Sequence, residues 1–140
     1  MTLSDEQIQK FSLICDELSD ENDSLKREIL THAGNRWSLG VIYRLGIQGT
    51  LRHAELAKAM PGVTQRMLTR TLRQLERDGL ISRHDHQQKT PHPRVDYTLT
   101  ELGKGMLLNM LPLWNWVIEN GSVFRRARED FASGPHHAGG

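Results

Sequence analysis

The chain has a single cysteine, Cys15, among its 140 residues. One thiol excludes an internal disulfide and any zinc site built from several cysteines, and it fits a reducing compartment. The chain also has no run of about 18 apolar residues, the length that a membrane-spanning helix needs. Its beginning, MTLSDEQIQK, lacks the basic-then-apolar pattern of a signal peptide. We therefore expect a cytoplasmic protein that does not enter a membrane.

The motifs that identify many enzymes are also missing. The sequence has no glycine-rich phosphate loop, no nucleophile elbow and no paired carboxylates in a recognisable frame. His84 and His86 share one face of a predicted strand, and His92 could approach them across a hairpin. No carboxylate or thiol completes this set, so contacts with phosphate or solvent are the simpler interpretation. We expect no enzyme, no cofactor and no metal site.

Positive charge is scarce in total but concentrated in the middle of the chain. The formal net charge is +1. Residues 1–30 carry three basic and eight acidic side chains, residues 31–100 carry eleven and five, and residues 101–140 carry four of each. A basic middle is expected when one segment meets phosphate and its flanks meet protein. On charge alone, chance clustering on a solvated surface explains the pattern equally well.

Apolar spacing and capping residues predict three helices in the first third of the chain. A capping box begins a helix over residues 5–18. The polar run SDEND is expected to end it, and Asp23 or Ser24 to cap a second helix that stops at a left-handed Gly34. A third apolar stripe follows and is expected to close at Gly46.

The middle of the chain has the pattern of a winged helix-turn-helix. Residues 53–60 are rich in alanine and leucine, and the pair Pro61 and Gly62 ends this helix sharply. Thr64 caps the next helix, which is expected to stop at Gly79. Two helices joined by a tight glycine-containing turn form a helix-turn-helix. The alternating segments LISRH and RVDYTLT, with a proline-containing polar loop between them, predict a β-hairpin, or wing.

The last third is predicted to be a long helix capped by Thr100, with a kink at Pro112 and a shorter amphipathic piece after it. The fold class is therefore mainly α with a small β-hairpin wing (α+β): a winged helix-turn-helix with N- and C-terminal dimerisation helices. The expected division is N-terminal dimerisation helices over 1–33, the winged helix-turn-helix over 34–100, a C-terminal dimerisation helix over 101–131 and a disordered tail over 132–140.

The helix after Thr64 carries the main functional signal. At about 100° per residue, its leucines fall on one side and four arginines on the other, within about 60°. Glu76 and Asp78 are expected to point elsewhere. A run of arginines is often only a solvated face, but this one lies between a tight turn and a hairpin. The planar guanidinium group can bond guanine O6 and N7 or clamp a phosphate.

This pattern predicts the DNA contacts residue by residue. Residues near the start of such a helix point deepest into the major groove, and the wing can reach the adjacent minor groove or its phosphates. The expected base-reading residues are Gln65, Arg66, Thr69 and Arg70, the expected backbone contacts are Arg73 and Arg77, and Thr64, Arg83, Lys89, His92 and Arg94 complete the set.

Residues 34–111 resemble the HxlR-type branch of winged-helix regulators, near the larger MarR-type group. The segments that carry the resemblance are GNRWSLGVIYRL, PGVTQRMLTRTLRQLERDGLISR and, most specifically, PHPRVDYTLTELGKGML. The resemblance implies a dimeric DNA-binding regulator whose terminal helices form the dimer contact and whose helix from Thr64 enters the major groove. Arg36 stands where a lysine is usual and His53 where many members have phenylalanine. Redox-sensing members carry a cysteine near the position of Asp23 or Ser24.

The first and last helices have apolar faces, which we expect to form the homodimer contact. The expected contact residues are Ile8, Phe11, Cys15, Leu18, Met106, Met110, Leu113, Trp114 and Val117. Trp114, Trp116 and Met110 could instead line an aromatic effector pocket, although large apolar groups at helical spacing are more often interface core.

Cys15 is open to two interpretations. It shares an apolar helical face with Phe11 and Leu18, so a buried packing cysteine is the simpler one. A redox sensor would need a lowered thiol pKa, and Asp16 and Glu17 beside it favour the neutral thiol. The packing role is favoured, and a redox role stays open.

Taken together, these patterns predict a sequence-specific regulator of transcription, a repressor that binds double-stranded DNA as a homodimer on a pseudopalindromic operator. A small molecule or a redox signal is the expected kind of effector. The alternative is a winged-helix module that binds protein or RNA, because a fold does not determine a function.

Overall fold

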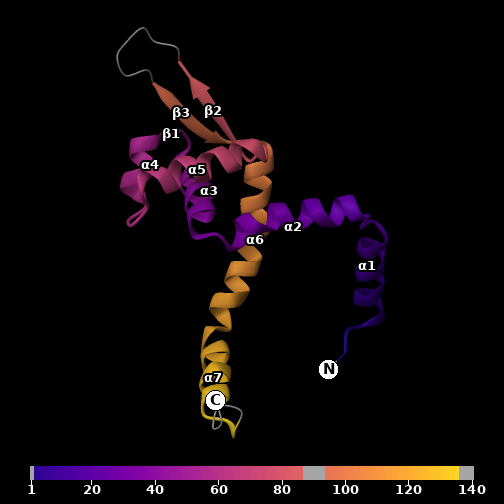
Figure 1. Ribbon diagram of the computed structural model, residues 1–140. Helices are drawn as coiled ribbons and strands as arrows, with labels where there is room; N and C mark the ends of the chain where they lie inside the picture. The colour runs from indigo at the N-terminus through magenta and orange to yellow at the C-terminus, as the bar shows by residue number, and fades with distance from the viewer. Residues whose placement is uncertain (1, 87–93, 136–140) are drawn as a thin grey trace.

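The elements described here come from a computed structural model that describes residues 2–86 and 94–135. This part of the chain is mainly helical and contains one small β-sheet, as the sequence predicted (Figure 1). The elements are α1 (Asp5–Asp16), α2 (Asp20–Gly34), α3 (Arg36–Gln48), β1 (Leu51–Arg52), α4 (His53–Ala59), α5 (Gln65–Arg77), β2 (Ile81–Asp85), β3 (Val95–Leu99), α6 (Glu101–Glu119) and α7 (Gly121–Ala132).

The three strands form one antiparallel sheet in the order β1-β3-β2. The wing hairpin is in register from Ile81 opposite Leu99 to Asp85 opposite Val95. The short β1 adds a third strand on the other side of β3, with Leu51 opposite Tyr97. The sequence predicted both the hairpin and an extended piece before α4, and the structure joins them in one sheet.

The hydrophobic core gathers around α3, which contacts α2, α4, α5, α6 and β3. Val41, Ile42 and Leu45 lie on its buried side. They belong to the same hydrophobic core as Leu68 and Leu75 of α5, which are fully buried. Full burial of side chains of this size stabilises the fold by about 1.5–3 kcal/mol each. The head that carries the helix-turn-helix is therefore held from the inside by apolar side chains of α3.

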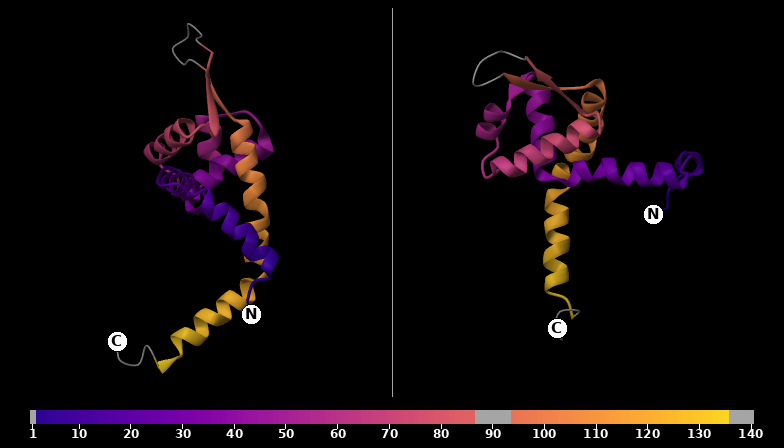
Figure 2. Two further views of the ribbon diagram at one scale, coloured as in Figure 1. Left: turned by 90° about the vertical axis from the view of Figure 1, so that its right-hand side faces the viewer. Right: turned by 45° about the horizontal axis from the view of Figure 1, so that its top comes forward.

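Two helical arms extend from this head. Figure 1 shows α2 leaving it sideways, with α1 at its far end, while α6 leaves it downward and continues into α7. The right view of Figure 2 shows the same separation, and its left view shows α7 turning away from the line of α6. Helix α1 has no buried residue. No helix in the described part of the chain is both long and apolar enough to cross a bilayer.

The polar run SDEND begins a helix instead of ending one. The capping box at Ser4 starts α1 as predicted. Helix α2 then starts within SDEND: the Ser19 hydroxyl accepts a hydrogen bond from the Asn22 backbone amide at 3.1 Å. The prediction of Asp23 or Ser24 as the cap was therefore wrong. Acidic side chains in a first turn favour helix formation because they face the positive end of the helix dipole.

Of the glycines expected to end the second and third helices, Gly34 does end α2 and Gly46 does not end α3. The left-handed glycines in the described residues are Gly49, Gly62 and Gly79, so Gly34 does not take the conformation that we expected. Asn35 follows it and caps α3, its side-chain oxygen accepting hydrogen bonds from the backbone amides of Trp37 and Ser38. Gly46 lies inside α3, which ends at Gln48 with Gly49 as its C-cap. Gly49 takes the positive φ of this cap, which glycine adopts without the steric cost of a side chain.

Candidate nucleic-acid interface

Helix α5 begins where the sequence predicted, and its cap sets its orientation. The Thr64 hydroxyl accepts a hydrogen bond from the Met67 backbone amide at 3.1 Å. Gly62, with φ of 88°, turns the chain between α4 and α5. The buried residues of α5 are Leu68, Thr71, Leu72 and Leu75. Because these side chains face α3, the opposite side of α5 faces outward.

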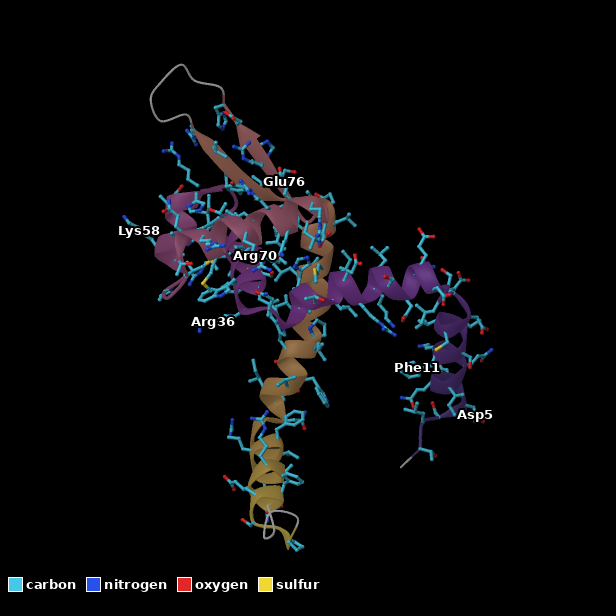
Figure 3. The ribbon with its side chains drawn as sticks, in the orientation of Figure 1. Asp5, Phe11, Arg36, Lys58, Arg70 and Glu76 are labelled. Atoms are coloured by element: carbon cyan, nitrogen blue, oxygen red, sulfur yellow. The ribbon has the colours of Figure 1, made fainter. Side chains whose placement is uncertain are left out.

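That outward side carries the predicted arginines. Thr64, Gln65, Arg66, Arg70, Arg73 and Arg77 are all exposed. Figure 3 shows Arg70 on α5 and Lys58 on the neighbouring α4. Among the residues that the structure describes, Arg66, Arg70 and Arg73 form no ion pair. Three guanidinium groups on one helix face are therefore available to an external anion.

Arg77 differs from the other three because an acidic residue holds it. Its Nε donates to Asp78 Oδ1 at 3.1 Å. Burial raises the pKa of Asp78, but hydrogen bonds from Arg77 and His32 outweigh burial and leave that pKa below its ordinary value. The same pairing raises the pKa of Arg77. The prediction that Asp78 points away from the arginines was therefore wrong: it lies just beyond the last turn of α5, where the helical angle no longer applies.

A polar cleft of about 380 Å³ lies between α5 and the wing. It is lined by Thr69, Leu72, Arg73, Glu76, Arg83 and Tyr97. Arg73 of α5 and Arg83 of β2 place two guanidinium groups in one cleft, an arrangement that suits a phosphate. Glu76 lines the same cleft, which corrects the expectation that it points elsewhere; it follows Arg73 by three residues and so shares a helix face with it.

The wing holds its charged side chains around a buried carboxylate. Asp96 is 5% exposed. It accepts hydrogen bonds from His86 Nε2 at 2.7 Å and from Arg94 Nε at 3.4 Å. The hydrogen bond from His86 and the charge of Arg94 hold the pKa of Asp96 below its usual range, although burial opposes this. Arg94 lies at the end of the hairpin that is farther from Ile81 and Leu99, and it is therefore held there by its carboxylate partner Asp96.

Two predicted wing contacts, Lys89 and His92, lie outside the described residues. Of the three histidines considered for a metal site, the two that the structure describes have separate partners: His84 Nε2 lies 3.1 Å from Thr98 Oγ1, and His86 bonds Asp96. Within residues 2–86 and 94–135, no cluster of three His, Cys, Asp or Glu side chains could hold a metal ion.

A buried histidine joins α2 to the end of α5, and no sequence signal indicated it. His32 is 5% exposed. Its Nε2 lies 2.6 Å from Asp78 Oδ2, and its Nδ1 lies 3.2 Å from Ser38 Oγ. Serine, histidine and aspartate are in series, as in hydrolases, but Ser38 is only 1% exposed. A substrate has no access to that hydroxyl, so the series is a structural contact.

The residues expected at the dimer contact divide into two groups. Ile8, Phe11, Cys15, Leu113 and Val117 are exposed, and Leu18 is half-buried. Met110, at 6% exposed, belongs to the core of its own chain, and Met106 and Trp114 pack against that core. Met110 is thus corrected to a core residue, because α3 lies against this part of α6. Trp116 instead meets Phe124 edge to face at 5.5 Å, and an aromatic effector pocket at the dimer contact stays a prediction.

Cys15 is exposed. Within its own chain this thiol is not buried, because α1 packs on no other element closely enough to bury any of its residues. The packing role at the dimer contact stays a prediction. The exposure of the thiol leaves both a contact with a second chain and chemical reactivity as options.

Comparison with known proteins gives one consistent result. The HxlR-like helix-turn-helix family profile matches residues 32–123. An uncharacterised HTH-type transcriptional regulator of Methanothermobacter thermautotrophicus is 38% identical over 102 residues, which cover 72% of this chain and 76% of the relative. The Escherichia coli regulator YtfH is 34% identical over 91 residues, covering 65% and 70%.

Solved structures agree with the sequence relatives. The transcriptional regulator YtfH of Salmonella typhimurium superposes with a TM-score of 0.62 at 33% identity, covering 74% of this chain and 90% of that one. The redox regulator HypR in its reduced form gives 0.61 at 36% identity, covering 70% and 94%. The predicted winged helix-turn-helix fold is therefore confirmed. The chain belongs to the HxlR-like helix-turn-helix family of transcriptional regulators.

Proposed function

We propose that this regulator binds double-stranded DNA sequence-specifically as a homodimer and represses transcription. The observation that carries the proposal is the outward face of α5, on which Arg66, Arg70 and Arg73 are exposed and form no ion pair within the described residues. Guanidinium groups in this arrangement suit guanine edges and phosphates. In this role α5 is the recognition helix, and we call it so below.

The assignment of individual contacts follows from their positions. Gln65, Arg66 and Arg70 lie in the first half of the recognition helix, which enters the major groove most deeply in helix-turn-helix proteins. Arg73 and Arg83 share the cleft beside the wing and are assigned to phosphates. Arg77 is expected to contribute less to DNA binding than the other three arginines of α5, because Asp78 already holds its guanidinium group.

The arms support the homodimer. Large exposed apolar side chains occur throughout α1, α6 and α7, including Phe11, Leu113 and Phe124. Exposed apolar surface of this extent is typical of an interface. A dimer would place two recognition helices about one helical turn of DNA apart. A dimer seated on promoter DNA blocks polymerase without any further activity, which is why we propose repression.

Fluorescence anisotropy with duplexes from the DNA upstream of the gene tests the proposal. Binding by about 6–10 phosphate contacts should weaken by about 10³- to 10⁵-fold between 50 and 200 mM salt. Arg70→Ala should cost about 1–3 kcal/mol on the specific duplex. Arg126→Ala, on exposed α7, is the matched loss of one arginine and should leave binding unchanged. If the protein binds no duplex tightly at physiological salt, the result would favour the protein- or RNA-binding module instead.

Control by a redox signal is the second part of the proposal. Its support is the exposed thiol of Cys15 and the similarity to HypR, a redox regulator. DNA binding should be measured with and without diamide for the parent and for Cys15→Ser. An equal response of both proteins would reject Cys15 as the sensor. Control by a small-molecule effector stays a prediction.

A further inference from the structure

A hydrogen bond crosses from the first helix of the helix-turn-helix to the middle of the recognition helix. His53 Nε2 lies 3.2 Å from Thr69 Oγ1. His53 is the first residue of α4, directly after β1, and both side chains are half-buried. The imidazole therefore lies behind the recognition helix and reaches one of its polar side chains.

The two threonines of this helix, Thr69 and Thr71, differ in the hydrogen-bond partner of their hydroxyl groups. The Thr71 hydroxyl donates to the Met67 carbonyl at 2.9 Å, the usual bond of a helical threonine to its own preceding turn. Thr71 is 6% exposed. Thr69 instead bonds to a residue of another helix. A hydroxyl group has one donor and two acceptor positions, so the imidazole occupies one of them and fixes the rotation of the group.

The surroundings of Thr69 show where its remaining hydrogen-bonding capacity faces. Thr69 lines the cleft between α5 and the wing together with Arg73, Arg83 and Tyr97. It also lies one helical turn after Arg66, whose side chain is exposed. A ligand held by these arginines would therefore come within reach of the Thr69 hydroxyl, while His53 stays behind it.

We propose that His53 is a positioning residue for DNA recognition, which holds the Thr69 hydroxyl in the direction of a base and so sets part of the base preference without itself touching DNA. This inference rests on the proposed DNA binding. It adds a residue of α4 to the determinants of specificity, through a contact that the recognition helix does not make alone.

The experiment uses the full chain and duplexes selected from a random library by the parent protein. His53→Leu removes the hydrogen bond and Thr69→Val removes the hydroxyl with little change of shape. Each should weaken discrimination at one base pair on the order of 5-fold, the effect of one net hydrogen bond. The double variant should be no worse than either single variant. His53→Gln can place an amide near the position of Nε2 and should restore the preference.

Thermal unfolding of the same variants separates positioning from simple bracing of the two helices. Lower stability of His53→Leu with an unchanged base preference would overturn the inference. Additive losses in the double variant would also overturn it, because His53 would then act by a contact of its own. If the parent binds no duplex in a salt-dependent manner, the proposed function itself fails. If the parent binds DNA but the base preference of the His53 variant is unchanged, only the inference about His53 fails.

Discussion

Single residues at the end of the recognition helix link it to the N-terminal arm. The Asp78 carboxylate is hydrogen-bonded to His32 of α2 through one oxygen and to Arg77 of α5 through the other. Its side chain is 11% exposed, so its charge is compensated by hydrogen bonds and not by water. A change at Asp78 should therefore affect both the stability of the head and the direction in which α2 leaves it.

Asp78→Asn tests this link through its pH dependence. Because the folded-state pKa of Asp78 is lowered, its contribution to stability is complete above the ordinary aspartate pKa of 3.8 and is lost as pH falls through the folded value. The free energy of unfolding should drop by about 1–3 kcal/mol in the variant at neutral pH. Urea unfolding should show this gap narrowing below about pH 4. Asp130→Asn on exposed α7 should show no comparable gap.

Substitution of Glu76 is predicted to raise the affinity for DNA, whereas substitution of Arg70 is predicted to lower it. Glu76 lines the cleft that Arg73 and Arg83 share, so a phosphate seated there would meet a like charge. Glu76→Gln removes this repulsion and should raise affinity about 2- to 5-fold, equally for all duplex sequences. Anisotropy titrations on specific and unrelated duplexes would measure it. Weaker binding of the variant would mean that phosphate does not enter the cleft.

The sequence predicted residues whose role depends on near neighbours and missed those whose role depends on distant ones. Ser4, Thr64 and Thr100 were identified as caps because the amides that they accept from lie three residues ahead. The contact of His32 with Asp78 spans 46 positions, and neither periodicity nor spacing could indicate it. The face of arginines was predictable because helical geometry alone separates it from the leucines.

Among the elements, α6 shows how closely one helix must approach the wing. A Cβ on Gly103 would collide with the backbone carbonyl of Leu80, whereas a Cβ on Gly105 would have open space. Both glycines lie in the first turns of α6. Leu80 comes just before β2 and cannot move without disturbing the hairpin, so Gly103 sets the distance between α6 and the sheet.

These two glycines form a matched pair of alanine substitutions. Gly103→Ala should lower the free energy of unfolding by about 1–3 kcal/mol, because overpacking forces a backbone shift. Gly105→Ala should raise it by about 0.5–1 kcal/mol, since alanine favours a helix interior over glycine. Urea unfolding of both variants measures the difference. Equal effects would show that α6 does not lie against Leu80 as described.

The order and type of the elements were predictable, and several of their boundaries were not. Apolar spacing identified α3, α5 and α6 and the two wing strands, because each buries one face. The start of α2 within SDEND was missed because the same acidic residues favour both turns and helix N-termini. The joining of β1 to β3 depends on strand pairing, which local patterns do not specify.

At the scale of the whole molecule, the chain separates a packed head from two arms that it does not cover. Of the large exposed apolar side chains, only Tyr43, Ile47 and Met67 belong to the described head. The others lie before or in α1 and α2 or along α6 and α7, the segments that leave the head in Figure 1. An amphipathic helix gains most of its stability from packing. In the proposed homodimer, the apolar arms of the second copy would supply α1 with such a packing surface.

Phe11→Asp tests whether α1 forms part of that interface. Phe11 is 57% exposed, and in a twofold dimer the substitution acts twice. Loss of two buried phenylalanines should cost the dimer about 4 kcal/mol. Sedimentation velocity should then find the parent near twice its mass of 16.0 kDa and the variant as a monomer with weakened operator binding. Gln9→Asp adds the same charge to the same helix and should leave the dimer intact. A dimeric Phe11→Asp protein would remove α1 from the interface and leave α6 and α7 to form it.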